Sequence, residues 1–155
     1  KRVLKVSPKE RQKEVLRRLL RMAREHEKPV MIHSRYAWKD AFDLVKEAGV
    51  KRAVFHWYTG FSSVLRDIIH AGYFISATPA AEYHHEHQRA IREVPLENLL
   101  LETDCPVMYG RETRYRSTPA DILRSLEAVA KLREMAKEKV AEQTYRNTAT
   151  FFNLR

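Results

Sequence analysis

The sequence predicts an α/β fold in which parallel strands alternate with helices. Short, nearly continuous apolar runs of the kind found in strands buried on both faces recur along the chain. Amphipathic stretches of about ten residues or more lie between them, long enough for the helical crossovers that parallel strands require. With 155 residues, 44% of them hydrophobic, the chain can form one domain with its own core.

The first predicted element is a helix with a clear start. The segment SPKE (7–10) predicts a capping box with proline in the first turn, and apolar residues then recur at helical spacing as far as His26. The apolar run PVMIH (29–33) predicts the first strand. A second helical pattern over 38–48 ends at Gly49, a residue that often follows the last turn of a helix.

The alternation then repeats. The runs RAVFH (52–56) and YFISA (73–77) predict two strands on either side of a helix over 62–71, and a short helical piece over 88–93 leads to the fourth strand, LLLET (99–103). Successive β/α units of this kind predict one parallel sheet.

A polar loop follows the fourth strand. The segment STPAD (117–121) predicts a second capped start, for a helix that runs to about Glu134, and a last helix is expected over 136–152. Because no linker, repeat or low-complexity segment divides the chain, we expect a single domain over 1–155.

Basic residues outnumber acidic ones by 29 to 20, which gives a net charge of +9. This excess favours a polyanionic partner such as nucleic acid or an anionic membrane surface. The single cysteine, Cys105, excludes a disulfide framework, and no apolar run is long enough for a membrane span or a signal-peptide core. We therefore expect a cytoplasmic protein without membrane contact, and because the chain begins with Lys1 rather than methionine, its start is expected upstream.

Polar side chains occupy the points where the predicted strands end. His33, His56 and the region of Ser76 end the first three strands, and Glu102 and Asp104 end the fourth. In parallel α/β sheets the chemistry gathers at the carboxyl ends of the strands, so these groups are expected to converge on one rim. Two histidines and a carboxylate in equivalent positions favour a site for Zn²⁺, Mn²⁺ or Fe²⁺ over isolated core histidines.

Three further features near this rim have two readings each. Arg35 is either an ordinary surface arginine or a bidentate clamp for a phosphate. The segment EYHHEH (82–87) is interpreted as a solvated helix start that could pick up metal adventitiously. Cys105 is interpreted as a small buried residue rather than a nucleophile, because no histidine adjoins it in the sequence.

Several motifs together resemble the TatD-type metal-dependent deoxyribonucleases, a branch of the amidohydrolase-like (β/α)8 TIM barrels. The stretches that carry the resemblance are PVMIHSR (29–35), VFHWYTG (54–60), GYFISA (72–77), LLLETDCPV (99–107) and VAEQTYRNTATFFNL (140–154). The resemblance implies that His33, His56 and Asp104 bind a divalent metal (Zn, Mg or Mn), with one or two ions in a complete site. It also implies that Glu102 steadies a ligand or a bound water.

The sequence departs from the family pattern in three places. The His-x-His pair and the bridging glutamate of the family's earlier strands are missing, so the resemblance implies the last four β/α units of a barrel that typically needs about 250 residues. Trp57 stands where many relatives carry a small residue, and is expected to narrow the mouth of the site or to offer a stacking surface for a base. The stretch YRSTPAD (115–121) replaces a segment that commonly contains asparagine.

The resemblance implies a metal-dependent phosphodiester hydrolase acting on DNA, with Asp104 and Glu102 as catalytic residues and with Arg35 and Trp57 contacting the substrate. Two alternatives stay open at this point: an amidohydrolase-like enzyme acting on a small molecule, and an inactive half-barrel that pairs with a partner chain. Because four parallel strands cannot close a barrel, an N-terminal half or a second copy of the chain is expected to complete the structure.

Overall fold

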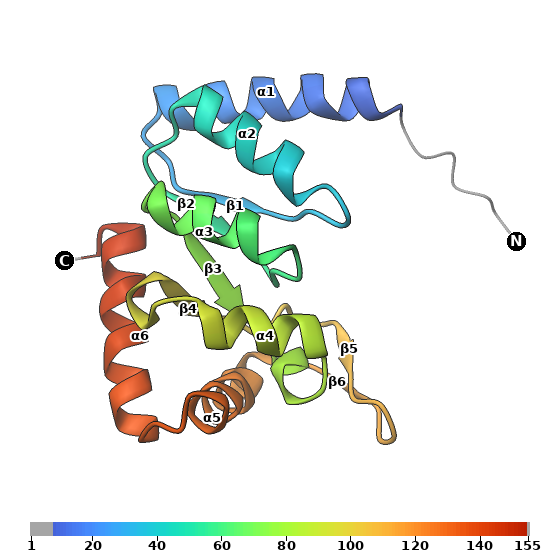
Figure 1. Cartoon of the computed structure of the whole chain (residues 1–155), viewed down its shortest axis with the longest axis vertical. Coiled ribbons are helices and arrows are strands. Elements are labelled where there is room, and N and C mark those ends of the chain that lie inside the picture. The colour runs from blue at the N-terminus through green and yellow to red at the C-terminus, as the bar shows by residue number, and fades with distance from the viewer. Residues whose placement is uncertain (1–7, 155) are drawn as a thin grey trace, which may run out of the picture.

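The computed structural model describes residues 8–154 and contains a parallel sheet surrounded by helices (Figure 1). The helices and strands are, in chain order, α1 (Lys9–Glu25), β1 (Val30–Ile32), α2 (Trp38–Ala48), β2 (Ala53–Phe55), α3 (Ser62–His70), β3 (Phe74–Ala77), α4 (His85–Glu93), β4 (Leu99–Leu101), β5 (Met108–Tyr109), β6 (Tyr115–Arg116), α5 (Ile122–Arg133) and α6 (Lys137–Phe152). This order matches the predicted alternation of strands and helices.

The sheet has four strands in the order β1-β2-β3-β4, and all neighbouring pairs are parallel. Met31 is in register with Val54, and Ser76 with Leu100. The predicted α/β fold is therefore confirmed. Among the described residues, β1 and β4 each have one edge without a strand partner.

Several element boundaries differ from the predictions. The strands are shorter than expected, and β4 ends at Leu101 rather than at 103, so Glu102 and Asp104 lie in a loop. Helix α4 begins at His85 instead of 88. The loop after β4 contains the antiparallel pair β5-β6, which the sequence did not predict. The capping box at 118–121 is confirmed, whereas Ser7 of the first predicted box lies outside the described residues.

One face of the sheet packs against the helices to form the main hydrophobic core. Side chains on this face, such as Ile32, Phe55 and Ile75, belong to one buried cluster with residues of all six helices, from Leu20 of α1 to Val140 of α6. In Figure 1, α1 and α2 lie side by side at one end of the molecule and α5 lies at the other. Burial of these apolar side chains supplies the principal stabilisation of the fold.

The opposite face carries a smaller cluster made by Val54, Phe74 and Leu100 together with Phe151 of α6. The side chain of Asn147 anchors α6 to this part of the sheet, because its amide nitrogen donates to the carbonyl oxygens of Leu96 and Leu99, each at 2.7 Å. Side chains alternate between the two faces of a strand. His33 and His56, two residues after Met31 and Val54, therefore lie on the side of this second face.

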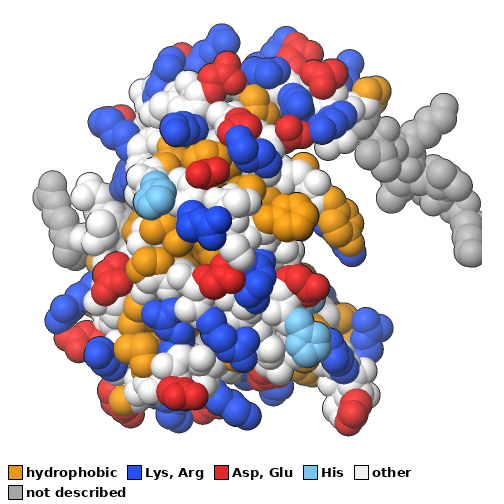
Figure 2. All heavy atoms as spheres, viewed as in Figure 1, with side chains coloured by type: hydrophobic (Ala, Val, Ile, Leu, Met, Phe, Trp, Pro, Cys, Tyr) orange, Lys and Arg blue, Asp and Glu red, His pale blue; other side chains and the backbone are white. Residues whose placement is uncertain are grey.

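Basic and acidic side chains are interspersed over the face of the molecule shown in Figure 2. The excess of positive charge is therefore spread over that face rather than gathered in one basic block. None of the helices within residues 8–154 is long and apolar enough to cross a membrane.

Candidate metal centre

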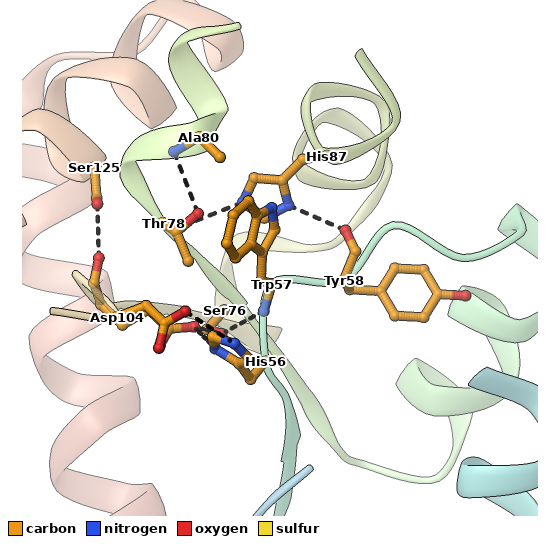
Figure 3. A network of polar contacts seen from close by, with 10 residues as sticks. His56, Trp57, Tyr58, Ser76, Thr78, Ala80, His87, Asp104 and Ser125 are labelled. Atoms are coloured by element: carbon orange, nitrogen blue, oxygen red, sulfur yellow. Dashed lines mark hydrogen bonds and ion pairs between the residues drawn. The ribbon is translucent and has the colours of Figure 1, made fainter. Parts of the chain in front are cut away.

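Three predicted site residues meet where β2 and β4 end. His56, Glu102 and Asp104 each offer one ligand atom, and these atoms all lie within 4.8 Å of one another. The His56 Nε2 atom is 3.4 Å from the Asp104 Oδ2 atom. Figure 3 shows the Asp104 carboxylate directed toward the imidazole of His56. The predicted convergence of His56, Glu102 and Asp104 on one rim is confirmed.

Glu102 fixes the orientation of the His56 ring. Its Oε1 atom lies 2.7 Å from His56 Nδ1, and the same oxygen accepts a hydrogen bond from the Ser76 hydroxyl. Ser76 in turn accepts a hydrogen bond from the Trp57 backbone N–H at 3.2 Å. With Nδ1 donating to a carboxylate, the lone pair of Nε2 is free and faces Asp104, the tautomer that a metal-binding histidine requires.

The charges around His56 oppose the effect of its burial. Burial favours the neutral ring, but the hydrogen bond and charge of Glu102, joined by the charge of Asp104, outweigh it and raise the pKa of His56. Burial and the neighbouring Glu102 also raise the pKa of Asp104, against the opposing influence of His56 and His33. Two carboxylates therefore lie close to the His56 ring, and a positive charge between them is favoured.

The donor set fits a divalent cation. Two atoms bound to Zn²⁺ at about 2.0–2.2 Å in tetrahedral geometry are about 3.4 Å apart, and the separation of His56 Nε2 and Asp104 Oδ2 is 3.4 Å. An imidazole lone pair and a carboxylate oxygen at this distance repel each other unless a proton or a cation lies between them. Nitrogen and oxygen donors of this type suit Zn²⁺ and Mn²⁺.

The backbone at the site adopts conformations that residues other than glycine rarely take. Asp104 has φ 46° and Trp57, directly after His56, has φ 45°. Left-handed conformations of this kind cost about 1–2 kcal/mol per residue. They persist where the surroundings fix them, and such residues concentrate at functional sites.

His33 lies beside this cluster but is not one of the three residues whose ligand atoms converge. Its ring centroid is 5.4 Å from that of His56. Arg35 is exposed, and its guanidinium stacks on the ring of Tyr36 at 5.5 Å. Neither the metal-binding role of His33 nor the phosphate-binding role of Arg35 follows from these contacts alone, so both stay predictions.

The structure identifies His87 as a residue that the sequence interpretation missed. The segment 82–87 was expected to be solvated, but the His87 side chain is fully buried. Its Nε2 atom accepts from the Thr78 N–H at 3.2 Å, and Nδ1 lies 3.0 Å from the Tyr58 carbonyl oxygen (Figure 3). Burial lowers the pKa of His87 to about 4. The neutral ring thus joins the loops that follow β2 and β3.

Trp57 packs within an aromatic group beside the metal-binding residues. Its ring centroid lies 5.5 Å from that of Tyr109 on β5, 6.3 Å from that of His56 and 6.4 Å from that of His87. The indole therefore connects the β5-β6 hairpin with the loop after β2. Its predicted contact with substrate stays a prediction.

The expectation for Cys105 is wrong, because the cysteine is exposed. Cys105 lies in the turn that follows Asp104, beyond the end of β4 at Leu101. The loop is held from the other side by α5, where the Ser125 hydroxyl donates to the Glu102 carbonyl oxygen at 2.7 Å.

Comparison with known proteins places the chain in a family. The family model described as TatD related DNase matches residues 3–153. The chain belongs to the TatD related DNase family. The resemblance seen in the sequence is thereby confirmed.

Individual relatives span bacteria and animals. The chain is 33% identical over 144 residues to human Deoxyribonuclease TATDN3, covering 93% of this chain and 52% of that protein. It is 31% identical over 153 residues to the Uncharacterized metal-dependent hydrolase YabD of Bacillus subtilis, covering 96% of this chain and 60% of the relative. The chain thus spans about half the length of the curated relatives it matches.

Solved structures share the arrangement of strands and helices. The crystal structure of YjjV, a TatD homologue from Escherichia coli K12, superposes with a TM-score of 0.85 at 27% identity, covering 94% of this chain and 58% of that chain. A TatD family hydrolase from Entamoeba histolytica superposes with a TM-score of 0.82 at 21% identity, covering 96% and 59%, which shows a common fold.

Proposed function

We propose that the chain carries the metal site of a divalent-metal-dependent phosphodiester hydrolase acting on DNA. The observation that supports this most directly is the His56–Glu102–Asp104 cluster, in which Glu102 orients His56 so that Nε2 faces the Asp104 carboxylate at 3.4 Å. Metal-dependent hydrolase and deoxyribonuclease are the activities named for its relatives.

His56 and Asp104 would hold the cation, and His33 would add a third donor from the neighbouring strand end. We propose one ion at this position, because three protein donors with one open position for water are the usual ligand set of a single catalytic ion. A bound divalent cation supplies Lewis acidity toward a phosphodiester and makes water a better nucleophile at neutral pH. Glu102 acts through His56, because its hydrogen bond holds a proton on Nδ1 and keeps the ring in one orientation, with Nε2 directed at the cation.

DNA as the substrate is supported by the charge of the chain and by Arg35. The net charge of +9 favours a polyanion. Arg35 follows His33 by two residues and lines the same groove as His33 and His56. Its planar guanidinium suits bidentate binding of a phosphate, which would place a phosphodiester near the metal-binding residues.

We also propose that the four β/α units correspond to the last four of a (β/α)8 barrel. The sequential parallel order β1-β2-β3-β4 and the site residues at the carboxyl ends of β2 and β4 support this reading. Completion of the sheet by an N-terminal half or by a second copy stays a prediction.

A hydrolysis assay tests the proposed function. Incubation of the protein with a fluorescent oligodeoxynucleotide and Mn²⁺, Mg²⁺ or Zn²⁺ should give cleavage that EDTA abolishes. Asp104→Asn should reduce the rate by about 100-fold or more, since the variant loses a charged ligand. The matched control Asp67→Asn, an exposed residue of α3, should leave the rate unchanged. No cleavage with any of the three metals, or equal rates for the wild type and Asp104→Asn, would refute the proposal.

A further inference from the structure

A groove of about 1050 Å³ opens beside the metal-binding residues. Its wall is formed by the loop after β1, the loop after β2 and the start of α4, and it includes both His33 and His56. Figure 2 shows the molecule hollowed on one side, with hydrophobic side chains at the edge of the hollow. A ligand in this groove would lie against the candidate metal centre.

Two large aromatic side chains in the groove wall are exposed to solvent. Tyr36 is 91% exposed and Phe61 is 81% exposed, and both line the groove. They come from the loops that begin with His33 and His56. Neither ring contributes to the hydrophobic core. Exposed aromatic rings beside a concave site are typical of ligand contacts, because burying them against a ligand releases water from apolar surface.

The backbone under Phe61 is fixed even though its ring is free. The Phe61 carbonyl oxygen accepts hydrogen bonds from the Tyr58 hydroxyl at 2.8 Å and from the Leu65 N–H at 3.0 Å. A side chain at Gly60 would lie 2.5 Å from the Tyr58 hydroxyl and 2.6 Å from Trp38, so glycine alone permits this close packing. Arg89 also donates to the Gly60 carbonyl oxygen. The loop therefore presents Phe61 in one place.

Tyr36 is likewise presented by a constrained backbone, with φ 62°. The guanidinium of Arg35 lies over its ring at 5.5 Å. Two other cations line the groove, and both have acidic partners: Lys39 pairs with Asp43, and Arg89 with Glu93. Arg35, by contrast, forms no ion pair with any residue of the described part of the chain. Its charge is therefore available to an anion.

We propose that Tyr36 and Phe61 form a stacking subsite for unpaired nucleobases, next to the phosphate that Arg35 binds. This inference rests on the proposed function and names the residues that recognise the bases. A ring face and an available cation, a few residues from a metal-binding histidine, match the base and the phosphate of one nucleotide unit. Only an unpaired base can offer its face to these side chains, because neighbours cover it in a duplex.

Intrinsic fluorescence can report this binding without any hydrolysis. The chain has two tryptophans, Trp38 and Trp57, and both line the groove. Titration with an oligodeoxythymidylate of eight nucleotides, in EDTA, should therefore change their emission. Tyr36→Ala combined with Phe61→Ala should raise Kd by about ten-fold or more, as expected for the loss of base stacking. Tyr145→Ala, which removes a 74% exposed tyrosine from α6, is the matched control and should leave Kd unchanged.

Two further titrations separate stacking from other contacts. An abasic strand of the same length should bind the wild type as weakly as the thymidylate binds the double variant. The conservative pair Tyr36→Phe and Phe61→Tyr should restore binding, whereas leucine at both positions should not, since leucine keeps the apolar surface but lacks a ring face. Because both side chains are exposed, these substitutions should leave the fold intact.

The proposal is overturned if the double alanine variant binds within two-fold of the wild type, or if the abasic strand binds the wild type as tightly as the thymidylate does. Tight binding of the thymidylate by the leucine pair would show that apolar surface is enough and that no ring face is needed, which would also overturn it. If the wild type fails to cleave DNA but binds it in a base-dependent manner, the proposed function is refuted while the subsite stands.

Discussion

His87 offers a quantitative test of how the loops at the site are held. Replacing it with phenylalanine removes the acceptor of the Thr78 N–H and the donor to the Tyr58 carbonyl oxygen. Both of these residues are fully buried, so water cannot replace the lost bonds. Each unsatisfied buried group costs about 1–3 kcal/mol. We therefore expect His87→Phe to lower the free energy of unfolding at pH 7 by about 3 kcal/mol.

The pH dependence of this loss follows from the depressed pKa of His87. Burial is the main cause that lowers its pKa from 6.5 to about 4, and the nearby His84 and His56 act in the same direction. The hydrogen bond to the Tyr58 carbonyl oxygen and the charge of Glu102 act in the opposite direction. Between pH 6.5 and 4 the unfolded chain binds a proton that the folded chain does not, so the wild type loses stability as the pH falls through this window. Lowering the pKa of His87 by about 2.5 pH units corresponds to a loss of about 3 kcal/mol in the free energy of unfolding across this window.

Urea unfolding at pH 7, 6, 5 and 4 measures this effect. The difference in the free energy of unfolding between the wild type and His87→Phe should decrease by about 3 kcal/mol from pH 7 to pH 4, because the variant lacks the titrating group. His85→Gln, a change to an exposed histidine of the same helix, should leave stability nearly unchanged throughout. A gap that stays constant within about 0.5 kcal/mol across this pH range would refute the reasoning.

Three further changes test other parts of the account. Gly60→Ala should destabilise the protein by about 1–3 kcal/mol, because its Cβ would lie 2.5 Å from the Tyr58 hydroxyl; an unchanged thermal midpoint would contradict this. Arg133→Met should lower the free energy of unfolding by about 1–3 kcal/mol, because Arg133 donates to the carbonyl oxygens of Ile91, Arg92 and Val94. Urea unfolding measures this loss against the exposed control Lys131→Met, and equal effects of the two variants would contradict it. Glu102→Gln should lower the pKa of His56 in the metal-free protein, because Glu102 supplies the largest contribution that raises it; an unchanged NMR titration of the ring would show that Glu102 does not control this histidine.

The four parallel strands and the main site residues could be predicted because they depend on local patterns. Strands that are buried on both faces appear in the sequence as apolar runs, and four such runs predicted the four strands. The residues at the carboxyl ends of these strands then predicted His56, Glu102 and Asp104 as site residues. Glu102 was expected both to steady a ligand or a bound water and to take part in catalysis. Its contact with His56 Nδ1 agrees with the first of these roles, and the second stays a prediction.

Other features depend on contacts that a local reading does not reveal. The pair β5-β6 has only two residues in each strand, too few to give an alternating pattern. The exposure of Cys105 depends on how the loop after β4 folds, and the residues next to it in the sequence do not reveal that. A signal for the burial of His87 was present, since His87, Ala90 and Ile91 recur at helical spacing, but the neighbouring polar residues obscured it.

Anomalous diffraction from crystals grown with Mn²⁺ or Zn²⁺ tests the central claim most directly. We predict one strong peak in bonding contact with His56 Nε2 and the Asp104 carboxylate, on the side facing His33. No such peak is expected in Asp104→Asn crystals grown in the same way. The claim would be contradicted by a map with no peak at this position, by an undiminished peak in the variant, or by a metal bound instead near His84 and Glu86, whose side chains lie 3.3 Å apart at the start of α4.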